Sequence, residues 1–178
     1  MDLYYYKIKE WERIGIYWII IVGSLLHYTY DWSNKSLIVA LFSPVNESLW
    51  EHLKMGYWAL TFFMAIEYWF IRDYTNSFFI GKTLGIIGMN LFIVIVFYSY
   101  TAIFNKHLFI IDIGSFILGA ILCQFISLKA MEKNLNTGID RIGLILFVLI
   151  GAIFILFTFR PPYLPIFKDS SKGIYGIE

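Results

Sequence analysis

Long, nearly uninterrupted apolar stretches are the feature that most restricts how this chain can fold. A helix needs about 20 mostly apolar residues to cross the hydrocarbon core of a bilayer. Segments of that length occupy residues 12–32, 44–71, 78–104, 107–128 and 141–159. Because backbone groups in lipid must satisfy their own hydrogen bonds, and these runs lack the alternation of barrel strands, each segment is predicted to be helical. The sequence therefore predicts an all-α, polytopic membrane bundle with about five transmembrane helices.

The composition agrees with a membrane protein whose main partner is lipid. Only 15% of the residues are charged, whereas soluble domains carry about 25%. The net charge of +1 mixes both signs without a basic stripe, which excludes nucleic acid as a partner. The single cysteine, Cys123, excludes an intrachain disulfide and is predicted to be a small buried side chain. Glycines such as Gly85 and Gly114 are predicted to allow close helix packing.

The connections between the apolar segments predict one domain, residues 1–178. Ser36–Phe42 is apolar but too short to cross, so we expect a re-entrant or interfacial half-helix there. Ser43 and Pro44 are typical of a helix start and are predicted to begin the second span. The tail at 160–178 is too apolar to extend freely into water and is predicted to fold back over the outer side.

The distribution of lysine and arginine indicates an orientation. Eight of the 14 basic residues fall on the side of the N-terminus and the other six on the opposite side. This bias predicts a cytoplasmic N-terminus and an extracytoplasmic C-terminus in a plasma membrane. Glu67 lies near the cytoplasmic end, five residues before Arg72, and is predicted to reach water without a specific role. Lys82 is counted among the basic residues of the same side.

Five alternating spans bring the three histidines, His27, His52 and His107, to the outer side of the membrane. Tyr98 and Tyr100 end the third span at the same level. Ionisable residues inside a membrane are costly and mark functional sites by default. The carboxylates near the histidines are Asp31, Glu47, Glu51 and Asp112, of which Asp112 lies deepest within an apolar run.

A metal-dependent membrane hydrolase is the first hypothesis for these residues. Imidazole and carboxylate ligands suit zinc or another divalent metal, and three protein ligands plus a water molecule make a hydrolytic site. Glu51 would be the general base, and Lys54 or Tyr98 would stabilise developing negative charge on a lipid or another membrane-associated substrate. The ligands in this hypothesis are two imidazoles and one carboxylate from three spans: His27, His52 and Asp112.

Two other functions fit the same residues. In a binding or transport module, a small molecule or ion would enter the outer pocket and contact Asp31, Asn46 and Glu47. At 20.9 kDa such a protein would need a partner or a homo-oligomer to form a full pathway. In a structural or assembly protein, the polar cluster would only fix helix packing. Glu51 and Lys54 would then be an ordinary ion pair three residues apart.

A resemblance to a known family is carried by PVNESLWEHLK, Pro44 to Lys54, together with His27 and the closing FKDSSKGIYGIE. These residues resemble a family of small bacterial integral membrane proteins of unknown function, over nearly the whole chain. The resemblance implies a multi-pass protein of the bacterial plasma membrane and implies no activity. The three histidines and an acid are also similar in design to zinc hydrolases of the alkaline ceramidase and adiponectin-receptor type, although their HxxxH pair is missing here.

Overall fold

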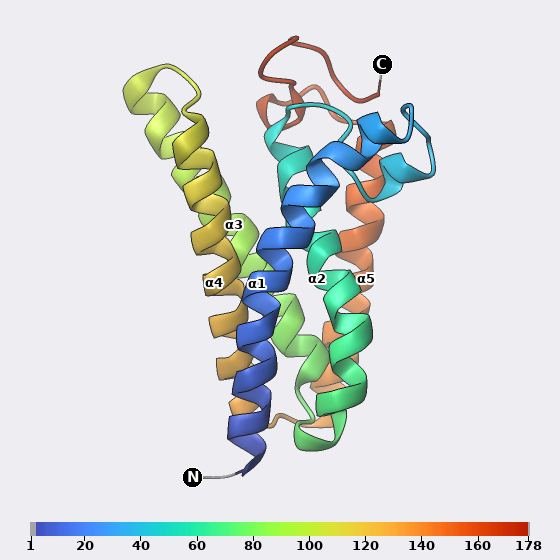
Figure 1. Ribbon diagram of the computed structural model, residues 1–178, viewed down its shortest axis with the longest axis vertical. Helices are drawn as coiled ribbons and strands as arrows, with labels where there is room; N and C mark the ends of the chain where they lie inside the picture. Colours follow the sequence, from blue (N-terminus) through green and yellow to red (C-terminus); the bar gives the residue numbers. More distant parts are fainter. Residues whose placement is uncertain (1–2, 178) are drawn as a thin grey trace.

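Five long α-helices make up the computed structural model, which describes residues 3–177 (Figure 1). The two ends of the described chain lie at opposite ends of the bundle, which we call the amino end and the carboxy end. The all-α prediction is confirmed. The elements are α1 (Leu3–Trp32), η1 (Val39–Leu41), α2 (Leu49–Ile71), η2 (Arg72–Tyr74), α3 (Phe78–Phe104), α4 (Phe109–Glu132), α5 (Thr137–Phe159) and η3 (Pro165–Phe167), where η marks a short 3-10 helix.

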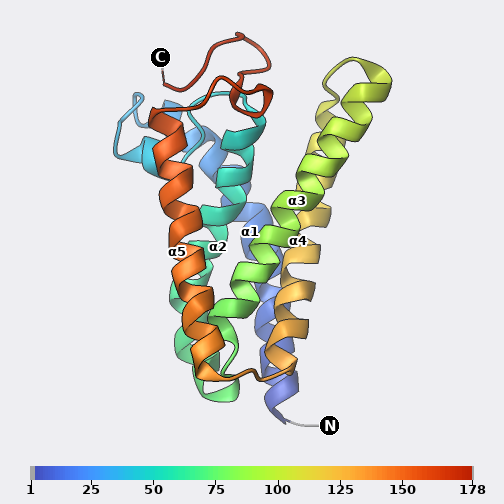
Figure 2. The same cartoon turned by 180° about the vertical axis from the view of Figure 1, so that it is seen from behind.

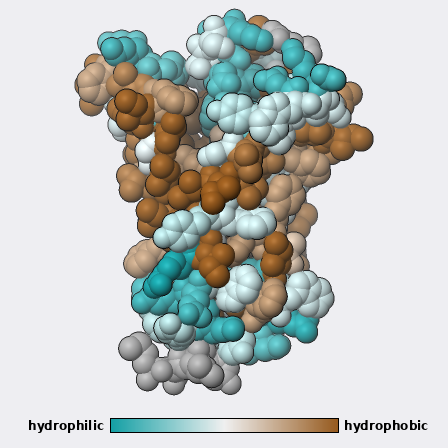
Figure 3. All heavy atoms as spheres, viewed as in Figure 1, coloured by the Kyte–Doolittle hydropathy of each residue, from teal (hydrophilic) through white to brown (hydrophobic). Residues whose placement is uncertain are grey.

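Three of the described helices, α3, α4 and α5, are long and apolar enough to span a membrane. The prediction of five spans is therefore not supported. The physical reason is that α1 and α2 carry charged residues and many tryptophans and tyrosines, which lower their mean hydropathy. The three apolar helices indicate a membrane protein, and apolar residues form a broad band on the face shown in Figure 3. Their exposed aliphatic side chains are compatible with lipid contact.

The helices pack in a way that divides the carboxy end into two parts. α3 and α4 form an antiparallel hairpin, α1 packs against α2 and α4, and α5 packs against α3 and α2. At the carboxy end the α3–α4 hairpin leans away from α1, α2 and α5, as both views show (Figures 1 and 2). Side chains near the α3–α4 turn are thereby separated from those at the end of α1 and the start of α2.

The second helix begins later than the sequence predicts. α2 starts at Leu49, where Ser48 caps it by accepting a hydrogen bond from the Glu51 amide. The prediction of a start at Ser43 and Pro44 is wrong because residues 43–48 form an irregular segment with bends at 43 and 45–47. The side chain of Asn46 accepts a hydrogen bond from the Ser48 amide at 2.9 Å and stabilises one of these bends. The predicted half-helix is reduced to the short η1.

A buried cluster of charges joins four helices toward the amino end. Lys82 of α3 places its Nζ 2.6 Å from Glu67 Oε2 of α2, 3.0 Å from Glu12 Oε1 of α1 and 3.2 Å from Gln124 Oε1 of α4. The Lys82 and Glu67 side chains are fully buried. The prediction that Glu67 reaches water is therefore wrong, because its side chain is turned into the bundle, where it contacts the ammonium of Lys82. We call Glu12, Glu67 and Lys82 the buried ion cluster.

A close contact between α3 and α4 depends on the absence of a side chain at Gly85. A Cβ atom at this position would lie 2.6 Å from the backbone carbonyl oxygen of Cys123 and 3.1 Å from its Sγ. Cys123 is buried, as the sequence predicts. Gly114 differs, because a Cβ there would meet nothing within 4 Å. The prediction of close packing at glycines therefore holds for Gly85 and fails for Gly114.

We predict that Gly85→Ala destabilises the protein by about 1–3 kcal/mol, because a backbone carbonyl has to move to admit the methyl group. The measurement is the free energy of unfolding in detergent micelles. Gly114→Ala is the matched control and should leave stability unchanged or raise it by up to about 1 kcal/mol through helix propensity. Equal stabilities for the two variants would show that the α3–α4 contact at Gly85 is loose.

Candidate metal centre

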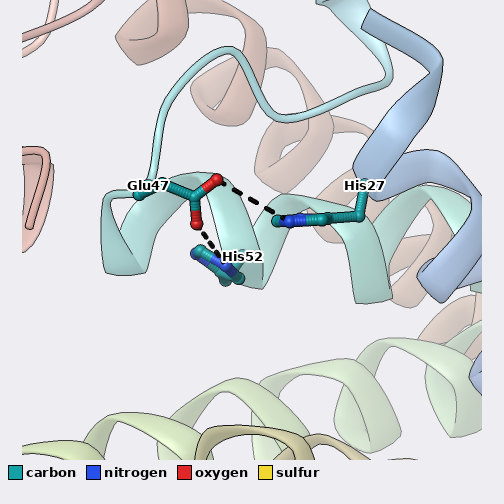
Figure 4. Close-up of side chains that lie close together, drawn as sticks. All are labelled: His27, Glu47 and His52. Carbon is teal, nitrogen blue, oxygen red and sulfur yellow. Dashed lines mark ion pairs between the residues drawn. The ribbon is translucent and has the colours of Figure 1, made fainter. Parts of the chain in front are cut away.

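Three side chains from three segments converge at the carboxy end. His27 comes from the last turns of α1, Glu47 from the irregular segment before α2, and His52 from the first turn of α2 (Figure 4). Glu47 Oε1 lies 3.7 Å from His27 Nε2, and Glu47 Oε2 lies 3.5 Å from His52 Nε2. One ligand atom from each of the three residues lies within 4.8 Å of the other two. We call His27, Glu47 and His52 the outer triad.

The hydrogen bonding of His52 defines what its outward nitrogen can do. His52 Nδ1 lies 2.8 Å from the carbonyl oxygen of Ser48, which can only accept a hydrogen bond. In the neutral ring Nδ1 therefore carries the proton, and Nε2 presents a lone pair toward the carboxylate of Glu47. Two acceptors that face each other at 3.5 Å need a proton or a cation between them. Such a backbone bond is also how metal-binding histidines are oriented in proteins.

The chain after α5 holds Glu47 in place. The Glu47 amide donates a hydrogen bond to Asp169 Oδ2 at 3.0 Å. Its carbonyl accepts hydrogen bonds from the amide and the hydroxyl of Ser170, at 3.3 and 3.0 Å. Asn46 next to it donates to the carbonyl of Gly176 at 2.9 Å. Four hydrogen bonds thus tie residues 46–47 to the folded-back tail, of which the structure describes residues 160–177.

Asp169 is the organising residue of the tail. It is buried, and its Oδ1 accepts hydrogen bonds from the amides of Ser171 and Lys172 and from the Ser171 hydroxyl, each at 2.7 Å. Burial alone would raise the pKa of Asp169, but these donors and the Glu47 amide outweigh burial and lower it. The carboxylate form is therefore the form that fits the docked tail.

A cavity of about 190 Å³ adjoins the outer triad. Its lining includes His27, Asp31 and Glu47 together with tail residues such as Asp169. The triad is partly open to solvent, with side-chain exposures of 25% for His27, 31% for His52 and 49% for Glu47. A ligand in the cavity would therefore reach His27 and Glu47 directly. Asn46, the third predicted substrate contact, also lines this cavity.

The predicted general base Glu51 and the predicted cation Lys54 lie in a separate, buried network. Lys54 Nζ lies 2.5 Å from Glu51 Oε2 and donates hydrogen bonds to the Ala40 carbonyl at 3.0 Å and to Thr158 Oγ1 at 2.8 Å. Thr158 Oγ1 lies 2.8 Å from Glu51 Oε1, and the Val45 amide donates to Glu51 Oε2 at 3.2 Å. Both carboxylate oxygens of Glu51 are thus occupied. The network joins α2 to η1 and α5 and supports the loop that carries Glu47.

The predicted residues of the α3–α4 hairpin do not join the outer triad. Asp112 accepts a hydrogen bond from the Tyr100 hydroxyl at 2.6 Å, beside the turn between α3 and α4. His107 packs on the ring of Phe97 at 5.2 Å between ring centroids, and Tyr98 is 42% exposed. The predicted set of ligands was His27, His52 and Asp112. The structure places Glu47 beside the two histidines instead, because the hairpin that carries Asp112 leans away (Figure 1).

The sequence did not predict that Glu47 lies between the two histidines of the outer triad. It also did not predict the buried ion cluster. Glu47 was expected on a helix, although Asn46 and Ser48 on either side of it are typical of a turn followed by a helix cap. Lys82 stands four residues inside α3, in the apolar stretch FFIGKTLGII. A lysine at that position signals a buried partner of opposite charge.

Comparison with known proteins gives one result. The model of a family described as "Family of unknown function (DUF6512)" matches residues 3–177. Neither the search among curated proteins nor the search among solved structures found a match. The match covers nearly the whole chain, and it agrees with the resemblance to a family of unknown function. The chain therefore belongs to this family of unknown function, DUF6512.

Proposed function

We propose that this membrane protein binds a divalent transition metal, preferably zinc, through His27, Glu47 and His52, and that the metal acts on a ligand held in the adjoining cavity. The observation that carries the proposal is that His52, oriented through Nδ1 by the Ser48 carbonyl, directs Nε2 at a carboxylate oxygen of Glu47 at 3.5 Å, so that two acceptors face each other when the ring is neutral. A bound cation removes the repulsion between these two acceptors. Two imidazoles and one carboxylate are a ligand set of catalytic zinc sites, which leave a coordination position open.

The spacing of the outer triad suits such an ion. Zinc bonds to nitrogen and oxygen are about 2.0–2.2 Å long, so that ligand atoms in a tetrahedral site lie about 3.4 Å apart. The two distances to Glu47, 3.7 and 3.5 Å, are close to this value. The largest separation in the group, up to 4.8 Å, requires a small rotation of one imidazole. His27 can supply it, because its Nδ1 has no hydrogen-bond partner among the described residues.

The reaction that this site supports best is hydrolysis of a lipid or another membrane-associated substrate at the outer face of a bacterial plasma membrane. A bound zinc ion supplies Lewis acidity and an acidified water molecule. Asp31 is exposed and lines the cavity beside His27, so it can accept a proton there. It replaces Glu51 in this role, because both oxygens of Glu51 are already engaged. The tail closes one side of the cavity and positions Glu47.

We predict that the purified protein, stripped with a chelator, binds about one zinc ion per chain, and that His52→Ala weakens this binding at least about 100-fold. Loss of a ligand should cost more than the 10- to 100-fold typical of a residue that only supports a ligand. Isothermal titration with zinc alone measures both affinities. His107→Ala is the matched control, since His107 lies on the α3–α4 hairpin. Equal affinities for His52→Ala and the wild type would refute the metal site.

We predict that Asp31→Asn keeps the zinc affinity within about threefold and lowers hydrolysis by 10²- to 10⁴-fold, the contribution of a general base. The measurement uses zinc-loaded protein and a panel of fluorogenic ester, amide and phosphodiester lipids. Glu132→Gln, on the surface at the end of α4, is the control. Tight zinc binding without turnover of any lipid by the wild type would instead favour a binding or transport module.

We predict that Asp169→Asn loosens the tail and weakens zinc binding about 10-fold, as expected of a residue that positions a ligand. Because the pKa of Asp169 is lowered from 3.8, its contribution to tail docking is complete at neutral pH. That contribution should vanish as the pH falls below 3.8 and through the lowered pKa. Hydrogen exchange at the Glu47, Ser171 and Lys172 amides reports the change. Asp73→Asn, exposed in η2 at the amino end, should leave these amides protected.

A further inference from the structure

The buried ion cluster contains more acid than base. Its two carboxylates, Glu12 and Glu67, surround the single ammonium of Lys82. Glu12 is 2% exposed, and Glu67 and Lys82 are 0% exposed. Fully ionised, the three side chains carry one uncompensated negative charge in a site without access to water. A charge buried without a partner is strongly destabilising, and ionisable groups usually become neutral instead of accepting that cost.

A second buried ion pair in the same helix bundle has equal numbers of positive and negative charges and can be compared with the buried ion cluster. Glu51 and Lys54 form a one-to-one pair, and both oxygens of Glu51 interact with donors. In the buried ion cluster, by contrast, Oε2 of Glu12 and both carboxylate oxygens of Glu67 have no hydrogen-bond partner among the described residues, and Glu67 Oε2 has only its ion-pair contact with Lys82. The difference is one missing positive charge. The buried ion cluster therefore needs one more proton or cation to be neutral, whereas the Glu51–Lys54 pair is already neutral.

The groups around the cluster indicate which acid remains charged. Glu12 Oε1 accepts hydrogen bonds from Lys82 Nζ at 3.0 Å and from the Ser127 hydroxyl at 2.8 Å, and both donors stabilise a carboxylate. Glu67 faces only the ammonium, at 2.6 Å from its Oε2. From α4, Gln124 directs its Oε1 toward Lys82 at 3.2 Å, and Cys123 is buried on the same helix. No second cation faces the cluster among the described residues.

We propose that Glu12, Glu67 and Lys82 form a proton-binding site inside the bundle, in which Glu67 holds the proton on Oε1 while Glu12 and Lys82 remain an ion pair. The cluster is then neutral overall, like the Glu51–Lys54 pair. The bound proton comes from water, and its release would leave the site with one negative charge. This inference is independent of the metal site at the other end of the bundle.

A route for exchange of this proton leads toward the amino end. A cavity of about 370 Å³ there is lined by Ile8 of α1 and Met131 of α4, among others. Ile8 lies four positions, about one helical turn, before Glu12 on α1. Met131 lies four positions after Ser127, which donates a hydrogen bond to Glu12, on α4. The cavity therefore lies about one turn beyond the cluster. Water in the cavity can exchange the proton when these two side chains move.

Infrared spectroscopy of the full-length protein in detergent tests the proposal. At neutral pH the wild type should show the carbonyl stretch of a protonated carboxylic acid in a spectral region free of carboxylate and amide bands. Glu67→Gln should remove this band. Glu12→Gln should remove it as well, because the remaining glutamate and Lys82 then balance each other, whereas the surface variant Glu132→Gln should keep it. A wild-type spectrum without the band would refute the proposal. Persistence of the band in Glu67→Gln would overturn the assignment to Glu67.

Stability of matched variants gives a second, independent readout. Glutamine mimics a protonated glutamate, so Glu67→Gln should unfold within about 3 °C of the wild type, which corresponds to about 1 kcal/mol for a chain of this size. Glu51→Gln makes the same chemical change at the balanced pair, leaves Lys54 without a counter-charge, and should unfold well below the wild type. Equal destabilisation by the two substitutions, or failure of Glu67→Gln to fold, would show that Glu67 is ionised and would overturn the proposal.

Discussion

The neutralisation of Lys82 inside the bundle is the constraint on which the rest of this fold depends. A buried ammonium requires carboxylates within about 4 Å, and here they come from two other helices, Glu12 of α1 and Glu67 of α2. α4 adds Gln124 and Ser127. These contacts fix the rotation of four helices relative to one another. They also explain how α1 and α2, which are less apolar than the other three helices, can pack within a membrane protein.

At the carboxy end the geometry is held by a different set of polar contacts. The Glu51–Lys54 pair connects α2 to η1 and α5, and the tail connects back to the loop before α2 through Asp169. Both arrangements act on residues 45–48, which carry Glu47 and cap α2. These contacts therefore hold two members of the outer triad, Glu47 and His52, in place. His27, whose Nδ1 makes no hydrogen bond within the described chain, is its adjustable member.

Two features could be predicted from the sequence: the helical class, and the end of the bundle at which His27 and His52 meet. The length of the apolar segments determines the first, and the alternating direction of successive helices determines the second. The sequence could not show that Glu47 precedes the helix, since a turn stabilised by Asn46 and by a tail 122 residues away depends on tertiary contacts. Nor could it show the lean of the α3–α4 hairpin, which separates Asp112 from the histidines. Hydropathy indicates how deep in the membrane a residue lies but not toward which neighbouring helix its side chain points. The burial of Glu67 against Lys82 was therefore missed.

The order of the ion cluster along the chain has a consequence for biogenesis. Ribosomal synthesis proceeds from the N-terminus, so both acids, Glu12 and Glu67, are made before Lys82. When α3 leaves the insertion machinery, its lysine can meet its counter-charges at once, and the lone ammonium need not wait in lipid for a partner. A nascent chain that ends after α3 already holds every charged member of the cluster, and α4 later completes the site with uncharged donors and acceptors.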